Sequence, residues 1–142
     1  MVVGCIQGRD THDALSLYRD LTKSLHGMRP RDFLLETLKM LGRPFSAEKL
    51  LCVCDEQRHH RHPYFGKEDL PGDYNSIWQD RGGERTGDGF YSVPLCSERK
   101  DPDQIKSKKK SLYKKRYEML DELENTIRRS LPMISPERFI DL

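Results

Sequence analysis

Two cysteines and three histidines lie close together in the middle of the chain, and their side chains are of the types that bind zinc. Cys52 and Cys54 are followed by His59, His60 and His62. Structural zinc sites normally separate the two cysteines of a pair by two to four residues, whereas here one residue separates them. On a continuous helix Cys54 would join the buried face and Cys52 would point elsewhere. We therefore expect no bound metal, with the cysteines packed as small apolar side chains and the histidines in solvent.

A block of basic residues follows in the last third of the chain. Its members are Lys106, Lys108, Lys109, Lys110, Lys114, Lys115 and Arg116. Such a block can neutralise the phosphates of a nucleic acid or lie at the headgroups of an anionic bilayer. Asp121, Glu122 and Glu124 come directly after it, which is typical of a helix of mixed charge whose first half is basic. We expect no direct contact with nucleic acid.

Residues arranged for catalysis are not found in the sequence. It has no serine in a glycine elbow and no phosphate-cradling loop,. Gly82-Gly83 and the glycines at 87 and 89 lack the strand-to-helix setting that nucleotide binding requires,. The acidic residues are scattered among lysines and arginines rather than arranged as pairs of carboxylates. We therefore expect a protein that is not an enzyme.

Helices are the elements that the sequence predicts around these residues. Apolar side chains recur at steps of three and four in the stretch 11–26, and Gly27 ends the pattern,. A second helix is predicted over 31–41, with Pro30 at its first position and Gly42 at its end,. A third is predicted from Ser46, as the capping residue, to about Arg61,. Three helices with short connections predict a small antiparallel bundle.

The stretch 63–102 differs from what precedes it, because glycine, proline and aspartate are dense and no periodicity is evident. Its many aromatic side chains are unusual for a free linker, so we expect it to lie extended on a partner. The expected docking residues are Tyr74, Trp78, Phe90 and Tyr91,. A last helix is predicted from about Pro102 to Ser130,. The predicted fold class is all-α, a three-helix bundle (1–62), an extended docking segment (63–102) and a C-terminal basic, amphipathic helix with its tail (103–142).

Composition limits the remaining possibilities. The chain has 142 residues, of which 35% are hydrophobic, a low share for burying a full core without a partner,. Its 34% of charged residues leave a net charge of only +2, which does not favour nucleic acid,. The four cysteines have no spacing typical of a disulfide scaffold, so we expect free thiols in a reducing compartment,. No apolar run is long enough to span a membrane, and any membrane association is expected to be peripheral.

The triplet Leu17, Tyr18 and Arg19 lies on the first predicted helix. By pattern alone, a core tyrosine beside a solvated arginine explains such a triplet more often than a binding motif does. Its position near the N-terminus of a short helical chain resembles the LYR-motif family of small mitochondrial proteins, whose three-helix fold receives the acyl-phosphopantetheine arm of an acyl carrier protein. The resemblance implies that this arm is the cofactor, with none bound by the chain itself. The implied carrier-binding residues are Leu17, Tyr18, Arg19, Lys23, Arg29, Arg31, Lys39 and Arg43.

The stretch from Lys49 to Tyr64 resembles the third helix of the LYR subunit on the membrane arm of mitochondrial complex I, which ends at a similar His-Pro. Either Phe33 or Phe45 corresponds to the phenylalanine that this family places after the LYR helix. The resemblance implies a non-catalytic accessory subunit of a respiratory complex, complex I first, among other subunits on the matrix side of the inner mitochondrial membrane. A subunit of the mitochondrial ribosome is the first alternative, and an assembly factor for a respiratory complex or an iron-sulfur protein is the second.

Overall fold

Two apolar stretches about forty residues apart in the sequence pair at the centre of the computed structural model, which describes residues 1–6, 11–58 and 73–131. They form strands β2 (Lys49–Val53) and β4 (Phe90–Pro94), which run antiparallel with Leu51 opposite Ser92. Strand β1 (Val2–Val3) pairs with β2 in parallel, and β3 (Glu84–Arg85) pairs with β4 antiparallel. The result is a mixed four-stranded sheet in the order β1-β2-β4-β3.

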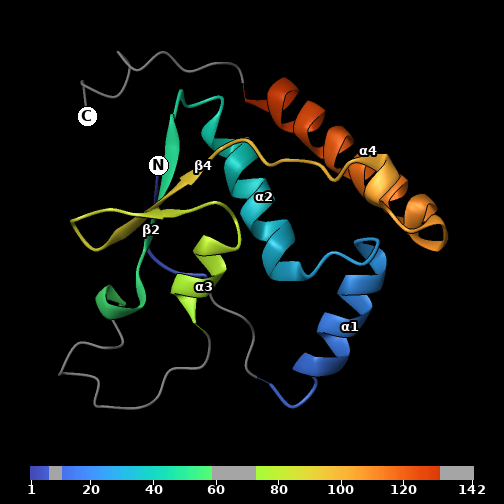
Figure 1. The fold of residues 1–142 in the computed structure, drawn as a ribbon, viewed down its shortest axis with the longest axis horizontal. Coiled ribbons are helices and arrows are strands. Elements are labelled where there is room, and N and C mark those ends of the chain that lie inside the picture. The colour runs from blue at the N-terminus through green and yellow to red at the C-terminus, as the bar shows by residue number, and fades with distance from the viewer. Residues whose placement is uncertain (7–10, 59–72, 132–142) are drawn as a thin grey trace.

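Helices lie beside this sheet and extend away from it (Figure 1). They are α1 (Ala14–Ser24), α2 (Pro30–Gly42), α3 (Tyr74–Gln79) and α4 (Ser107–Ser130), with 3-10 turns at Asp55–Gln57 and Pro102–Gln104. Within the described residues, none of the helices is both long and apolar enough to cross a bilayer. The fold is therefore α/β, and the predicted all-α class is wrong.

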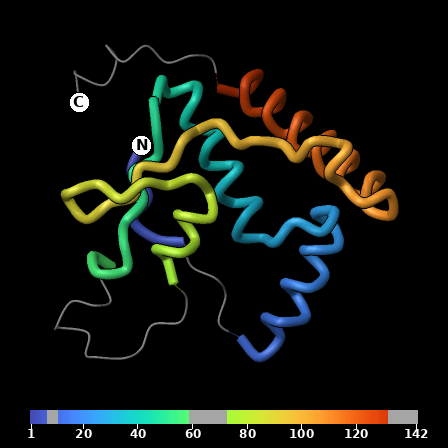
Figure 2. The backbone as a smooth tube through the Cα atoms, in the orientation of Figure 1, coloured from blue at the N-terminus to red at the C-terminus, as the bar shows by residue number. Residues whose placement is uncertain are grey.

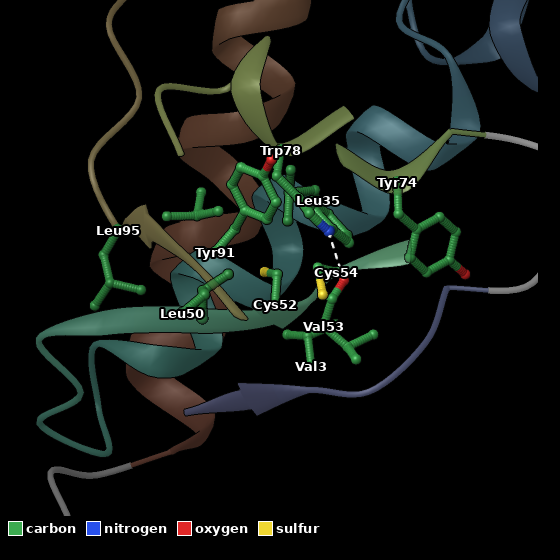
Figure 3. Packing of buried hydrophobic residues seen from close by; sticks show 11 residues of the cluster. Val3, Leu35, Leu50, Cys52, Val53, Cys54, Tyr74, Trp78, Tyr91 and Leu95 are labelled. Carbon is green, nitrogen blue, oxygen red and sulfur yellow. Dashed lines mark hydrogen bonds between the residues drawn. The ribbon is translucent and has the colours of Figure 1, made fainter. Parts of the chain in front are cut away.

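The main core lies between the sheet and helices α2 and α3 (Figure 3). Trp78 is its centre: the side chain is fully buried and its indole N–H donates to the carbonyl of Val53 over 2.9 Å. The Tyr74 ring meets the indole edge to face, with the centroids 5.5 Å apart. The Tyr74 hydroxyl also donates to the carbonyl of Ile6 over 2.7 Å, which fixes the N-terminal strand to α3.

A second, smaller core joins α2 to α4. Met40 of α2 packs with Leu120 and Ile127 of α4. Helix α4 therefore lies against the side of α2 rather than against the sheet (Figures 1 and 2).

The predicted third helix, from Ser46 to about Arg61, is wrong. Ser46 has a left-handed backbone with φ of 53°, so it forms a turn instead of capping a helix. The apolar run after it is an extended strand in which Leu50 and Cys52 are both completely buried. A run of only five residues fits one helical turn and a buried strand equally, and pairing with β4 decides in favour of the strand,.

The predicted extended segment (63–102) is also wrong where the structure describes it. It contains α3, β3 and β4, and β4 pairs along its whole length with β2, so this segment shares one core with the first 62 residues. Of the four expected docking residues, Tyr74, Trp78 and Tyr91 are buried in that core and Phe90 packs against it. These side chains are therefore covered by the chain itself. The final helix is confirmed, although it begins at Ser107 after a short 3-10 turn.

Candidate functional site

A cleft of about 420 Å³ lies between α1 and the beginning of α2, and this volume is within the usual range for small-ligand sites,. The chain turns sharply between the two helices (Figure 2), where His26 and Gly27 adopt left-handed backbone angles. One wall belongs to α1 and the other to the first turn of α2, with a contribution from Ile6, three residues after β1. The cleft is lined by Ile6, Tyr18, Thr22, Arg29, Pro30, Arg31 and Leu34.

The lining combines apolar surface with two cations. Ile6, Pro30 and Leu34 offer aliphatic carbon, whereas Arg29 and Arg31 offer guanidinium groups. Binding sites for small molecules commonly pair an apolar wall with a few polar groups that orient the ligand. Among the residues that the structure describes, no acidic side chain lines the cleft.

Arg31 has an unsatisfied donor beside this cleft. Its Nε is buried and has no hydrogen-bond partner among the described residues. The nearest carboxylate is that of Asp32, with Oδ1 3.5 Å away, but Arg81 holds the same oxygen at 2.6 Å. Because Asp32 is already paired, Arg31 keeps the capacity to bind another anion.

The N-terminus of α2 adds to the positive potential at the cleft. Pro30 occupies the first helical turn, where its missing N–H removes no hydrogen bond, as the sequence predicts,. The N-cap residue is Arg29, whose side chain accepts no hydrogen bond from the helix. The partial positive charge of a 13-residue helix therefore lies beside both guanidinium groups,.

The structure brings together three of the eight residues that the sequence marked as a binding site, namely Tyr18, Arg29 and Arg31. Leu17 is half-buried on another side of α1 and Arg19 is exposed. Lys23 is exposed and forms an ion pair with Asp20 over 3.3 Å. These three do not line the cleft.

The remaining two marked residues lie farther along α2 and are occupied within the fold. Lys39 is only 2% exposed; its Nζ donates to the Ser97 hydroxyl over 2.8 Å, and Ser97 donates to Glu36 over the same distance. Burial lowers the pKa of Lys39, and the carboxylate of Glu36 partly opposes that shift. Arg43 forms an ion pair with Glu124 of α4 and donates to the carbonyl of Leu95 over 3.0 Å. Both side chains connect α2 to its neighbours.

The cysteine pair lies in the main core. Burial raises the pKa of the Cys52 thiol to about 11, so this thiol is neutral and a weak nucleophile,. The three histidines that follow lie outside the described residues. Within the described residues, no group of three or more potential metal ligands is found.

Sequence reasoning missed Ile6, Thr22, Pro30 and Leu34 as lining residues. Thr22 and Leu34 were assigned to helices, but only the angle set by the turn at Gly27 brings their faces together. Ile6 reaches the cleft because Tyr74 bonds to its backbone, a contact between residues 68 positions apart. No local pattern marks such a contact.

Comparison with known proteins identifies the family. The model of a family described as "Protein of unknown function (DUF535)" matches residues 1–129. The chain belongs to the DUF535 family. An uncharacterized protein of Haemophilus influenzae is 34% identical over 123 residues, which are 87% of this chain and 41% of that protein. Uncharacterized protein YbjX of Escherichia coli is 30% identical over 126 residues, 87% of this chain and 38% of that protein.

The chain spans about two fifths of the length of these curated relatives. No solved structure matches it at a significant level.

Family membership corrects the resemblance to LYR proteins. The relatives are bacterial, and bacteria have no mitochondria. The mitochondrial location and the role as an accessory subunit of a respiratory complex that docks an acyl carrier protein are therefore wrong, and so are the ribosomal and assembly-factor alternatives. The triplet Leu17, Tyr18 and Arg19 is a chance match: three specified residues recur often in helical sequences, and here the third helix of the LYR fold is replaced by β2.

Proposed function

We propose that this chain is a binding domain for a small amphipathic anion, a phosphate ester or carboxylate that carries an apolar group. The observation that supports this most directly is that the guanidinium groups of Arg29 and Arg31 line an apolar cleft, while Asp32, the carboxylate beside Arg31, is already bound to Arg81. Among the described residues Arg31 therefore has N–H groups left for an anionic oxygen, and hydrogen bonds between charged groups are among the stronger ones. The apolar group of the ligand would cover Leu34 and Ile6.

The arrangement favours binding over catalysis. A guanidinium group offers several N–H donors and no acceptor, which suits both arginines to holding an anion. The lining includes the Thr22 hydroxyl, but that hydroxyl donates to the carbonyl of Tyr18 over 2.6 Å within α1. The cleft therefore presents two cations, aliphatic carbon and the Tyr18 ring, an arrangement that suits the holding of an anion.

The test uses hexyl phosphate, hexanoate and the neutral alcohol hexanol as probes, with binding to the full chain followed by NMR chemical shifts. We expect the two anions to shift signals of α1 and α2, and hexanol to bind at least about tenfold more weakly, because a hydrogen bond to a charged group is worth about 1.5–3 kcal/mol. Arg31→Gln should weaken hexyl phosphate binding by about tenfold or more for the same reason.

Arg19→Gln is the matched control, since it removes the same charge from an exposed position on α1 that does not line the cleft. It should leave the affinity within about twofold of the wild-type value, because an exposed charge outside the site is largely screened. Equal binding of hexanol and hexyl phosphate, or equal loss in the two variants, would show that the cleft does not recognise an anion.

A further inference from the structure

We propose a second, separate interaction surface: the basic first half of α4 docks on an anionic phospholipid surface. The stretch between Gln104 and Tyr117 contains six lysines and Arg116, and no acidic residue. Every one of the six lysines is exposed. Clusters of four to eight basic residues on a helix are typical of binding to anionic lipid.

These lysines do not stabilise the fold. They lie at the N-terminus of a 24-residue helix that has no acidic residue in its first turn and no side-chain cap, so they face the positive end of the helix dipole,. Lys110 and Lys114 are four positions apart within the helix, and like charges at that spacing repel,. Among the described residues only Lys114 has a carboxylate partner, Glu118 at 3.9 Å, and both side chains are more than half exposed.

The second half of the same helix is arranged differently. Asp121 is paired with Arg99, and Glu124 is paired with both Arg43 and Arg128. Charge is thus neutralised within the protein at one end of α4, whereas at the other end, among the described residues, only Lys114 has a carboxylate partner. An external anionic surface would remove the repulsion at the basic end.

Several observations favour lipid over nucleic acid. The cations are lysines, which act as point charges, and the one arginine is already engaged: Arg116 donates twice to the carbonyl of His26, over 3.1 and 2.9 Å, and lies over the Tyr113 ring,. Leu112, among the lysines, lies with one side against the turn at Gly27 and keeps 38% of its surface exposed. An exposed leucine can enter the interfacial region of a bilayer, whereas a polynucleotide backbone offers it no apolar partner.

The surface lies at an edge of the molecule, where a flat bilayer can reach it. Figure 1 shows the orange N-terminal half of α4 at the periphery, beside the turn between α1 and α2, and the Arg116 bonds to His26 fix that contact. The acidic residues from Glu118 onward would be repelled by the same lipid. We therefore expect α4 to approach the bilayer with its N-terminal half nearest to it.

The experiment measures sedimentation of the full chain with phosphatidylcholine vesicles, with and without about 30% phosphatidylglycerol. Binding should require the anionic lipid and should fall steeply as the salt concentration rises, because the Debye length shortens to about 3 Å at 1 M. A variant with Lys108→Gln, Lys109→Gln and Lys115→Gln should partition at least about tenfold more weakly, since each basic residue near the surface contributes about one factor of five.

The matched control removes three exposed cations elsewhere, with Lys49→Gln, Arg85→Gln and Arg129→Gln. It should retain vesicle binding within about threefold, and both variants should bind hexyl phosphate as the wild type does. Four results would overturn the proposal: no binding to anionic vesicles, equal binding to neutral ones, equal loss in the two variants, or tighter binding to random-sequence duplex DNA than to the vesicles. The last would assign the surface to nucleic acid.

Discussion

Replacing Trp78 by phenylalanine should lower the free energy of unfolding by about 3 kcal/mol. The substitution removes the indole N–H that donates to the Val53 carbonyl over 2.9 Å, and it leaves that buried carbonyl unsatisfied, at a cost of about 1–3 kcal/mol,. It also removes part of a side chain that is fully buried, worth about 1 kcal/mol more,. Trp78→Ala should cost about 5 kcal/mol, because the cavity adds to the lost contacts.

The assay is urea unfolding followed by far-UV circular dichroism. The control is Leu15→Ala on α1, where the side chain is 78% exposed and the change should stay within about 0.5 kcal/mol,. Trp78 is the only tryptophan of the chain, so fluorescence of the wild type gives an independent measure of its burial. Emission typical of a buried indole, poorly quenched by acrylamide, should change to that of a solvated indole in the same transition.

A cost below about 1 kcal/mol for Trp78→Phe would refute the packing described for this core. So would strong acrylamide quenching of the native protein, because a fully buried ring is out of reach of the quencher. Either result would indicate that α3 does not pack on this chain's own core and needs a partner in order to be ordered.

Two further predictions concern charge and thiol chemistry. The hydrogen bond from Arg43 lowers the pKa of the Glu124 carboxyl group below its ordinary 4.5. The folded state therefore binds a proton at Glu124 less readily than the unfolded state does. The resulting stability is present above about pH 4.5 and is lost as the pH falls through the folded-state pKa; acid titrations of unfolding should therefore be flatter for Arg43→Gln than for the wild type. Cys5 and Cys96 are exposed, whereas Cys52 and Cys54 are buried. Iodoacetamide should therefore alkylate the first two in the native protein and the other two only after urea is added. Mass spectrometry of the labelled peptides measures both. Parallel acid titrations of Arg43→Gln and the wild type would contradict the first prediction. Labelling of a buried cysteine at the rate of an exposed one would contradict the second.

Three helices could be predicted from sequence because each carries its own evidence. The apolar spacing along 11–26 and 31–41 and the positions of Gly27 and Pro30 fix α1 and α2 to within a few residues. The long apolar stripe before Pro132 likewise fixes the end of α4. These are local signals, and local signals suffice for helices because their hydrogen bonds join residues four apart.

The sheet was missed because its evidence is divided between distant stretches. Tyr91, Val93 and Leu95 point into the core and alternate with Phe90, Ser92 and Pro94, which is the period of two that a strand requires,. Asp88-Gly89 between β3 and β4 is a hairpin signal, and Gly89 takes the left-handed backbone angle that the turn needs, with φ of 85°,. Both the alternation and the hairpin signal lie in the stretch that the sequence analysis assigned to a partner-binding segment, so no strand was predicted there.

Some features of the candidate site could be predicted from neighbouring residues, and others depend on contacts between distant parts of the chain. The basic character of Arg29 and Arg31 was visible in the sequence, and so was the helix start between them. The pairing of Asp32 with Arg81, which leaves Arg31 without a hydrogen-bond partner for its Nε among the described residues, joins α2 to the turn after α3. That ion pair depends on a fold that the helix patterns did not predict, so this part of the argument for the proposed binding site could not be found from sequence.

The two walls of the cleft are held with unequal strength, and this bears on how a ligand would bind. Helix α2 contributes Leu35 to the main core and Met40 to the second one, whereas α1 has no buried residue. The α1 wall is attached chiefly through the turn at its end, where Arg116 bonds to the carbonyl of His26. Elements with few buried contacts open at low free-energy cost. A ligand would therefore meet its cations and Leu34 on the firm α2 wall and would add contacts to Tyr18 and Thr22 on the α1 wall, so binding would stabilise α1 more than any other helix.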